Sequence, residues 1–450
     1  MIKNMIISDA RRYIFLTIIS LLFSVSSGFA QTNWIKDANN PVLRRDTTIA
    51  SLPKDLYAIS DCWVLKEGNI YKMWYTGGGF NYPPDTLMRS RICYATSTDG
   101  VTWNKYAANP VLDISYVGGW DSLGVETVSI LIDSAAPSSE RYKMWYAGQT
   151  FNAYRYEIGY AYSPDGISWT KYPTPVLQVG SASEWDNGFI EGPSVIKEGN
   201  AYKMWYCGYD VTVDGSGTDG KANIGYATST DGILWTKYAN NPIMMTGVAT
   251  WDSIYVQDPH VIKEGSEYHM WYGGGQNDTY YDQQVGYATS SDGITWSKSP
   301  LNPVLTRGNP GEWDQILSSF PSVLNDNNTY KMWYTGRDLD PLPAASLNYY
   351  WEIGYATSEI AGLFDNSKSV AEEMELFPNP VADLLGIRLS AECNSGELTI
   401  YDLQGQLKYS SSVVSANNLQ IDLSDFVNGT YIIQFQNAEK QFKNRFILLR

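Results

Sequence analysis

The segment Tyr202-Lys-Met-Trp-Tyr206 is the key to the architecture, because its last three residues recur four more times along the chain. The other copies of Met-Trp-Tyr lie at residues 73–75, 144–146, 270–272 and 332–334, so the period is 60–71 residues. Repetition of one unit at such a period is the signature of solenoids, propellers and related arrays. The fold therefore follows from what a single unit can form.

Each unit contains four short runs rich in β-branched and aromatic residues, which is the pattern of β-strands. In the third unit these runs lie at residues 195–199, 202–206, 224–229 and 235–237. An Asp-Gly pair, Asp231-Gly232, stands between the third and fourth runs and is a tight-hairpin signal. Repeated four-stranded sheets of this length are the blades of a β-propeller.

The fifth unit stops after Ser358 and lacks its last strand. The missing strand is found at the other end of the chain, where residues 34–43 repeat the spacing of residues 103–112. The sequence thus predicts an all-β protein: a five-bladed β-propeller over residues 31–364 whose N-terminal strand completes blade five.

Residues 1–30 form a predicted secretory signal peptide. A basic start with Lys3, Arg11 and Arg12 precedes an apolar run over residues 13–25 and a small-residue exit that ends at Ala30. No other stretch is long and apolar enough to cross a bilayer, so we expect export through the inner membrane and no span in the mature protein.

Residues 365–374 are polar and form a predicted linker to a C-terminal β-sandwich over residues 375–450. The tail contains Leu376-Phe-Pro-Asn-Pro-Val381, Tyr401-Asp-Leu-Gln-Gly405 and Asn428-Gly-Thr-Tyr431 in that order. These elements resemble the type A C-terminal sorting domain of the type IX secretion system. The resemblance implies that this machinery is a partner, and that the protein is secreted or attached at the outer-membrane surface.

Composition excludes several function classes. With 48 acidic and 32 basic residues the formal charge is −16, which disfavours nucleic acid as a partner. Two histidines exclude a three-histidine zinc site, and we assign no metal ligand. We expect a monomer.

The binding face is predicted from loop variation. The connections between the second and third strands differ in every blade, whereas the other turns are mostly repetitive, and variation on one face of a repeat array marks its binding side. These variable loops span residues 77–91, 148–156, 208–222, 273–284 and 336–351.

The first strand of each blade lines the axis and begins on that face. Alignment of the blades on Val64 and its equivalents places one carboxylate at the mouth of the channel in four blades: Asp61, Glu126, Glu191 and Asp258. Two such charges at roughly 6 Å repel by about 3 kcal/mol at an effective dielectric near 20. A cluster that costs free energy favours a role with a cation, a proton or a sugar. The structural alternatives are loop capping, pairing with nearby arginines, or a Ca²⁺ in the channel.

The blade pattern, together with Phe189-Ile-Glu-Gly-Pro193 and Asp258-Pro259, resembles the five-bladed glycosidases of glycoside hydrolase family 43 and their relatives. That resemblance implies that Glu191 is the general acid and Asp61 the general base. Thr127 stands where the family has a pKa-tuning Asp, so its neighbour Glu126, or Asp258, would raise the pKa of Glu191.

Further residues are predicted to contact a substrate at this face. Trp63 and Trp351 are the two tryptophans that the repeat does not require, and they are candidate sugar platforms, with plain packing as the alternative. The other predicted contacts are Arg155, Arg337 and His260.

Two functions follow from this sequence. The first is a secreted glycoside hydrolase that cleaves poly- or oligosaccharide with a carboxylate acid/base pair at the axial channel and requires no cofactor. The second is a non-catalytic secreted propeller that binds glycan or protein, with a cation such as Ca²⁺ in the channel.

Overall fold

The structure is a computed structural model of the 450-residue chain. It describes residues 34–46, 55, 58–80, 88–115, 118–150, 155–210, 221–276, 282–327, 329–338, 351–359, 374–377, 381–389, 395–402, 407–414, 418–437, 441–448 and 450. The predicted signal peptide and linker, and parts of the variable loops, lie outside these residues. The chain folds into two compact units, and the boundary between them falls between Leu363 and Phe364.

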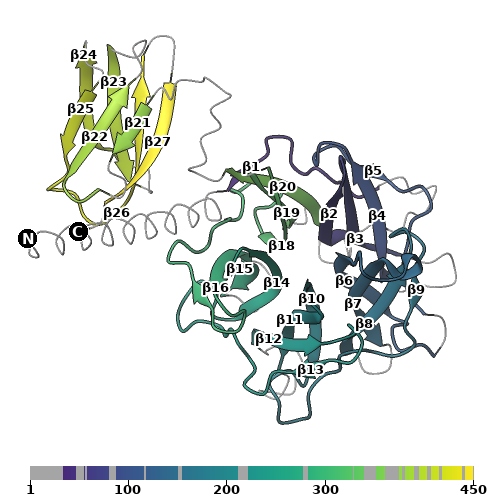
Figure 1. Ribbon diagram of the computed structural model, residues 1–450. Coiled ribbons are helices and arrows are strands. Elements are labelled where there is room, and N and C mark those ends of the chain that lie inside the picture. Colours follow the sequence, from purple (N-terminus) through teal and green to yellow (C-terminus); the bar gives the residue numbers. More distant parts are fainter. Residues whose placement is uncertain are drawn as a thin grey trace, which may run out of the picture. The chain divides into compact units, whose positions relative to one another are not determined.

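The first unit is a ring of five antiparallel sheets (Figure 1), which confirms the predicted propeller. Blade one contains β2 (Ala58–Glu67), β3 (Ile70–Phe80), β4 (Met88–Ser97) and β5 (Asn104–Lys105). Blade two contains β6 (Gly124–Ile132), β7 (Tyr142–Thr150), β8 (Arg155–Ser163) and β9 (Thr170–Lys171). Blade three contains β10 (Phe189–Glu198), β11 (Ala201–Tyr209), β12 (Ala222–Ser229) and β13 (Thr236–Lys237). Blade four contains β14 (Tyr255–Glu264), β15 (Glu267–Gly275), β16 (Gln284–Ser290) and β17 (Ser297–Lys298).

Blade five is completed from the other end of the chain, as predicted. It contains β18 (Leu317–Asp326), β19 (Thr329–Arg337) and β20 (Trp351–Glu359), and β1 (Ile35–Lys36) pairs antiparallel with β20. The Nζ atom of Lys36 lies 2.6 Å from the buried carboxylate of Asp314, 278 residues away. The N-terminal strand therefore closes the ring with a buried ion pair as well as with backbone hydrogen bonds.

The repeated tryptophans hold neighbouring blades together. Trp333 of blade five packs edge-on against Trp103 of blade one, and its indole N–H donates to the carbonyl of Gly100 at 2.8 Å. The equivalent tryptophan pairs are Trp145 with Trp235, Trp205 with Trp296, and Trp271 with Trp34 of the closing strand. These contacts bury large apolar rings at every such junction, which accounts for the aromatic-rich composition.

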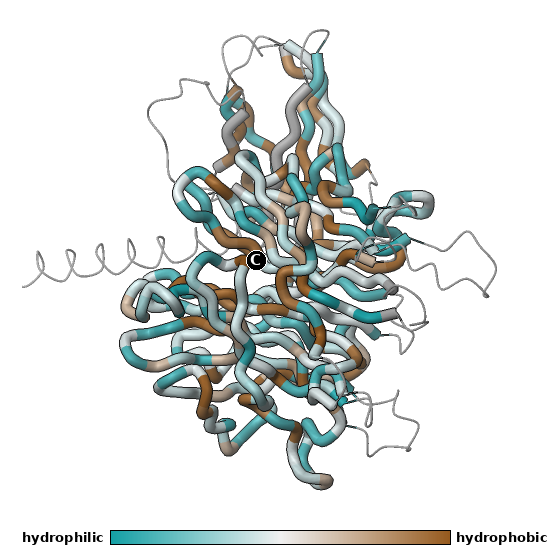
Figure 2. The backbone as a smooth tube through the Cα atoms, turned by 90° about the vertical axis from the view of Figure 1, so that its right-hand side faces the viewer, coloured by the Kyte–Doolittle hydropathy of each residue, from teal (hydrophilic) through white to brown (hydrophobic). Residues whose placement is uncertain are grey.

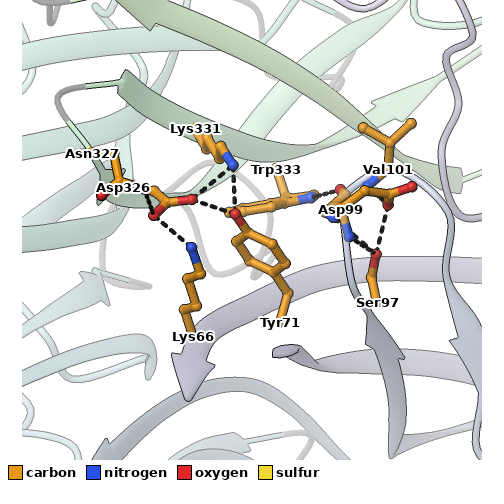
Figure 3. A network of polar contacts seen from close by, with 10 residues as sticks. Lys66, Tyr71, Ser97, Asp99, Val101, Asp326, Asn327, Lys331 and Trp333 are labelled. Atoms are coloured by element: carbon orange, nitrogen blue, oxygen red, sulfur yellow. Dashed lines mark hydrogen bonds and ion pairs between the residues drawn. The ribbon is translucent and has the colours of Figure 1, made fainter. Parts of the chain in front are cut away.

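Acidic residues at the end of the first strand join the blades in a second way. At the junction of blades five and one, Asp326 accepts hydrogen bonds from Lys66, Lys331 and the hydroxyl of Tyr71 (Figure 3). The same arrangement of one acid with lysine and tyrosine recurs at the next three junctions, around Glu67, Asp133 and Glu198. We call these four groups the junction clusters.

The second unit is a β-sandwich of two sheets. One sheet contains β21 (Met374–Phe377), β22 (Leu384–Leu389) and β25 (Asn418–Asp422). The other contains β23 (Ser395–Asp402), β24 (Leu407–Val414), β26 (Gly429–Gln436) and β27 (Gln441–Leu448). Leu385, Ile400, Ile433 and Phe446 are among the buried residues that form its core.

Hydrophobic and hydrophilic residues alternate over short distances along the chain (Figure 2), as expected for strands with one buried and one exposed face. Within the described residues, we find no helix of the length and hydropathy that crossing a membrane requires.

Candidate active site

A β-bulge at the same position of all five axial strands shapes the site. The register shifts by one residue near the start of β2, β6, β10, β14 and β18. The bulged residue has a positive φ of 44–57° in every blade, and these residues are Asp61, Thr127, Gly192, Asp258 and Phe320. A bulge re-aims side chains at a strand end.

Because of the bulges, the first strands present two rings of side chains to the axis. The residue before the bulge lines a cavity of about 440 Å³ in four blades, and these residues are Ser60, Glu126, Glu191 and Gln257. All five bulged residues line a second cavity of about 30 Å³. Asp61, Thr127 and Phe320 border both cavities, so the two lie next to each other.

The larger cavity brings together three of the four predicted carboxylates: Asp61, Glu126 and Glu191. These residues are separated by about 65 positions in sequence and come from β2, β6 and β10. Among the residues that the structure describes, none of the three forms an ion pair with lysine or arginine. The described ends of the variable hairpins supply part of the wall, through Ser90, Gln149, Tyr156 and Trp351.

Burial without a counter-charge sets the protonation of these acids. Burial, reinforced by the negative charges of Glu126 and Asp61, raises the pKa of Glu191 to about 8. Burial and the charge of Glu126 likewise raise the pKa of Asp61 to about 7, although Ser60 donates a hydrogen bond of 2.7 Å to its carboxylate. The pKa of Glu126 is also raised by burial, against hydrogen bonds from Tyr156 and Ser90.

The fourth carboxylate, Asp258, lies in the smaller cavity rather than the larger one. Both of its carboxylate oxygens are buried and have no hydrogen-bond partner among the described residues. Burial, followed by the charges of Glu191 and Asp61, raises its pKa well above the usual value. A Cβ atom on Gly192 would lie 2.6 Å from Oδ1 of Asp258, so the glycine after Glu191 makes room for this acid.

Two rings fill the axis beside the smaller cavity. Trp63 and His260 occupy equivalent positions in their blades, and their ring centroids are 4.4 Å apart. The Nε2 atom of His260 lies 2.9 Å from the backbone oxygen of Val323. Both side chains are buried, and neither lines the larger cavity. The structure therefore separates them from the predicted substrate face.

The remaining predicted contacts are divided. Trp351 lines the larger cavity and is backed by the guanidinium of Arg337, which lies 5.4 Å from the ring centroid. Arg337 itself is buried and is not part of the cavity wall. Arg155 is exposed at the start of β8 and also does not line the cavity.

Phe320 is a wall residue that the sequence did not single out. It borders both cavities and packs near Trp351, with ring centroids 6.1 Å apart. Its φ of 53° is rare for a bulky side chain and costs about 1–3 kcal/mol. The signal that could have found it is its alignment with Asp61 and Asp258 at the bulge position.

Thr127, where the family resemblance implies an aspartate, links blades. Its backbone N–H donates to Oγ1 of Thr76, and its own Oγ1 accepts from the backbone N–H of Gly192, both at 3.2 Å. A threonine therefore joins blades one, two and three at the bulge. Within the described residues there is no cluster of three or more His, Cys, Asp or Glu side chains that could hold a metal ion.

Two family models match the chain. Residues 135–300 match the N-terminal domain of the glycosyl hydrolases of family 32, and residues 375–449 match the secretion system C-terminal sorting domain. The second match confirms the resemblance predicted for the tail.

Solved glycosidases share the fold of the first unit. A glycosyl hydrolase from Bacteroides ovatus is 16% identical with a TM-score of 0.55, over 73% of this chain and 94% of its own. The ring is a glycoside hydrolase-like propeller. A thermostable family-43 glycoside hydrolase is 17% identical with a TM-score of 0.51, over 66% and 88%. A structure from work on the GH130 family of mannoside phosphorylases, which contains hydrolases that target β-1,2 mannosidic linkages, is 16% identical with a TM-score of 0.54, over 72% and 93%.

A curated relative of this propeller is the uncharacterized protein MT1551 of Mycobacterium tuberculosis, which is 26% identical over 216 residues. The alignment covers 47% of this chain and 65% of the relative.

Proposed function

We propose that the protein is a secreted glycoside hydrolase that acts on poly- or oligosaccharide. One observation carries the proposal: three acids with no cationic partner among the described residues line one cavity of about 440 Å³ in a glycosidase-type propeller. That volume is within the range of about 300–1,000 Å³ typical of small-ligand sites. The matched family 32 domain supports the same reaction class.

In this proposal Glu191 is the general acid. With a pKa of about 8 it still carries its proton at neutral pH, and it donates that proton to the glycosidic oxygen as the bond to the anomeric carbon breaks. Asp61, with a pKa of about 7, is the base that takes a proton from the attacking water. Glu126 keeps the pKa of both groups high through its negative charge.

Trp351 and Phe320 supply the apolar part of the proposed site. Their rings lie together on one side of the cavity that the acids line, and an aromatic face packs against the C–H face of a sugar ring. Trp63, Arg155 and His260 have no part in this proposal because none of them lines the larger cavity.

Kinetics on a panel of aryl glycosides and polysaccharides test the proposal. We expect the mature wild-type protein to turn over at least one sugar, and Glu191→Gln to lose activity mainly on substrates with poor leaving groups, which need the acid most. Asp61→Asn should lose activity regardless of the leaving group. Equal losses on good and poor leaving groups for Glu191→Gln would rule out its role as the acid.

The alternative is a glycan- or protein-binding propeller with a cation in the channel. It is favoured by Thr127, which stands in place of an acid, and by the two unpartnered oxygens of Asp258 next to Asp61 in the smaller cavity of the described residues. Carboxylate oxygens are ligands that Ca²⁺ prefers. Glycan binding without turnover, together with a rise in melting temperature on addition of Ca²⁺, would support this function instead.

Export is part of the proposed function. The sorting domain over residues 375–449 indicates secretion through its dedicated system to the cell surface or beyond. We propose that the predicted signal peptide over residues 1–30 first directs the chain across the inner membrane. Deletion of residues 375–450 should then retain the propeller inside the cell, which fractionation and immunoblotting would detect.

A further inference from the structure

A chain of buried polar side chains runs from Glu191 into blade four. The hydroxyl of Tyr209, on β11 next to β10, hydrogen-bonds with the carboxyl of Glu191. The same hydroxyl donates to Oε1 of Gln257 at 2.7 Å. Nε2 of Gln257 in turn donates to Oε1 of Gln283 at 3.2 Å.

The direction of these hydrogen bonds is fixed by counting protons. Gln257 uses its amide N–H₂ toward Gln283, so the atom that it presents to Tyr209 is a carbonyl oxygen, which can only accept. The tyrosine hydroxyl has a single proton, and that proton lies in the bond to Gln257. Toward Glu191 the same hydroxyl can therefore offer only a lone pair, and a lone pair is complementary to a protonated carboxyl.

We propose that Tyr209 and Gln257 are positioning residues that hold the proton on Glu191, by presenting an acceptor to its carboxylic O–H. The inference rests on the proposed role of Glu191 as the acid, but it concerns the proton itself and can be tested without turnover.

The surroundings make the alternative hydrogen-bond arrangement costly. For Tyr209 to donate to an ionised Glu191, its proton would have to leave Oε1 of Gln257. Gln257 and Gln283 are both fully buried, and Nε2 of Gln283 already has no partner among the described residues. A second unsatisfied buried group would follow, and such groups are rare in folded proteins.

The other titratable groups around Glu191 act in the same direction or are neutral. Asp61 faces it from β2, Glu126 from β6 and Asp258 from β14, and ionisation of each disfavours a second negative charge. Tyr156 on β8 and Cys207 on β11 also lie nearby, and burial raises the pKa of both, so both stay neutral. Tyr209 differs from all of these because it makes a directional contact with the proton.

The experiment is a ¹³C NMR titration of glutamate-labelled full-length protein, with the Glu191 carboxyl assigned by its loss in Glu191→Gln. In Gln257→Met the Tyr209 proton is free to turn toward Glu191, so the pKa of Glu191 should fall by about one pH unit, which corresponds to about 1.4 kcal/mol. In Tyr209→Phe the acceptor is lost and the pKa should fall as well. Gln284→Met, which changes the neighbouring residue on β16 and does not line the cavity, is the matched control and should leave the titration unchanged.

The opposite hydrogen-bond direction gives opposite results. If Tyr209 donates to the Glu191 carboxylate in the wild-type protein, Tyr209→Phe raises the pKa of Glu191 and Gln257→Met leaves it in place, and either result overturns the inference. Thermal unfolding of each variant confirms that it is folded. Absence of turnover on every sugar would remove the proposed function, while a fall of the Glu191 pKa in both variants would still support the proton arrangement.

Discussion

The two ends of one strand carry acids with opposite behaviour. On β10, Glu191 lies near the start with its pKa raised to about 8, and Glu198 lies at the end with its pKa lowered to about 2. On β2, Asp61 and Glu67 differ in the same way, at about 7 and about 2. Burial opposes ionisation at Glu198 too, but Lys203, Tyr268 and Lys263 donate hydrogen bonds that outweigh it. The protonation of an acid in this propeller thus depends on whether a lysine accompanies it.

Replacing an acid at each end of β10 should separate activity from stability most strongly. Glu191→Gln should lower kcat/KM by about 10²–10⁴ on substrates with poor leaving groups, because a general acid contributes that much. Its melting temperature should stay level or rise, since a buried carboxyl without a cation is removed. Glu198→Gln is the matched control and should lower the melting temperature while kcat/KM stays unchanged. Loss of activity in Glu198→Gln would mean that the two ends are not independent.

Removing a lysine tests the stabilising half of the comparison. Lys36→Met leaves the buried carboxylate of Asp314 without its cation and should cost about 2 kcal/mol of unfolding free energy, between the values for exposed and fully buried pairs. Lys298→Met breaks the equivalent pair with Asp252 inside continuous blade four, at the same 2.6 Å. A larger effect at Lys36, measured by urea denaturation, would isolate the contribution of ring closure. Equal effects would show that closure adds nothing beyond the pair.

The pH dependence should have opposite signs for the two sets of acids. Glu191 and Asp61 have folded pKa values above their usual 4.5 and 3.8, so the native state binds more protons and stability should fall as the pH rises from about 4 through 8. Glu67 and Glu198, with lowered pKa values, contribute stability above about pH 4.5 that is lost as the pH falls toward 2. Melting temperatures should therefore peak near pH 4–5, and Glu191→Gln should flatten the decline above that. For activity, the same pKa values place the maximum of kcat/KM between about pH 7 and 8.

The smallest expected effect concerns the strained wall residue of the cavity. Phe320→Gly should relieve the positive φ while it removes an aromatic surface, so KM should rise about five- to tenfold with little change in melting temperature. Ala249→Gly is the control, because Ala249 also has a positive φ of 54° but is exposed and does not line the cavity. It should be slightly stabilised with KM unchanged. A stable Phe320→Gly with normal KM would remove Phe320 from the proposed binding site.

Much of the candidate site was accessible from the sequence, and its errors have a common cause. Alignment of the repeats identified Asp61, Glu126 and Glu191 as neighbours at the axis, because equivalent positions of a propeller must converge. The same alignment could not reveal that a bulge turns Asp258 into a separate, smaller cavity. Nor could it distinguish Trp351, which lines the larger cavity, from Trp63, which is stacked on His260.

The sequence by itself determined the five blades, the closing N-terminal strand and the sorting domain, because each depends on local patterns that repeat or match along the chain. Only the tertiary structure decided which acids share a cavity, which have a lysine beside them and where the proton of Glu191 lies. The physical reason is that a pKa depends on burial and on charges within a few ångströms, and here those charges come from residues about 65 or more positions away.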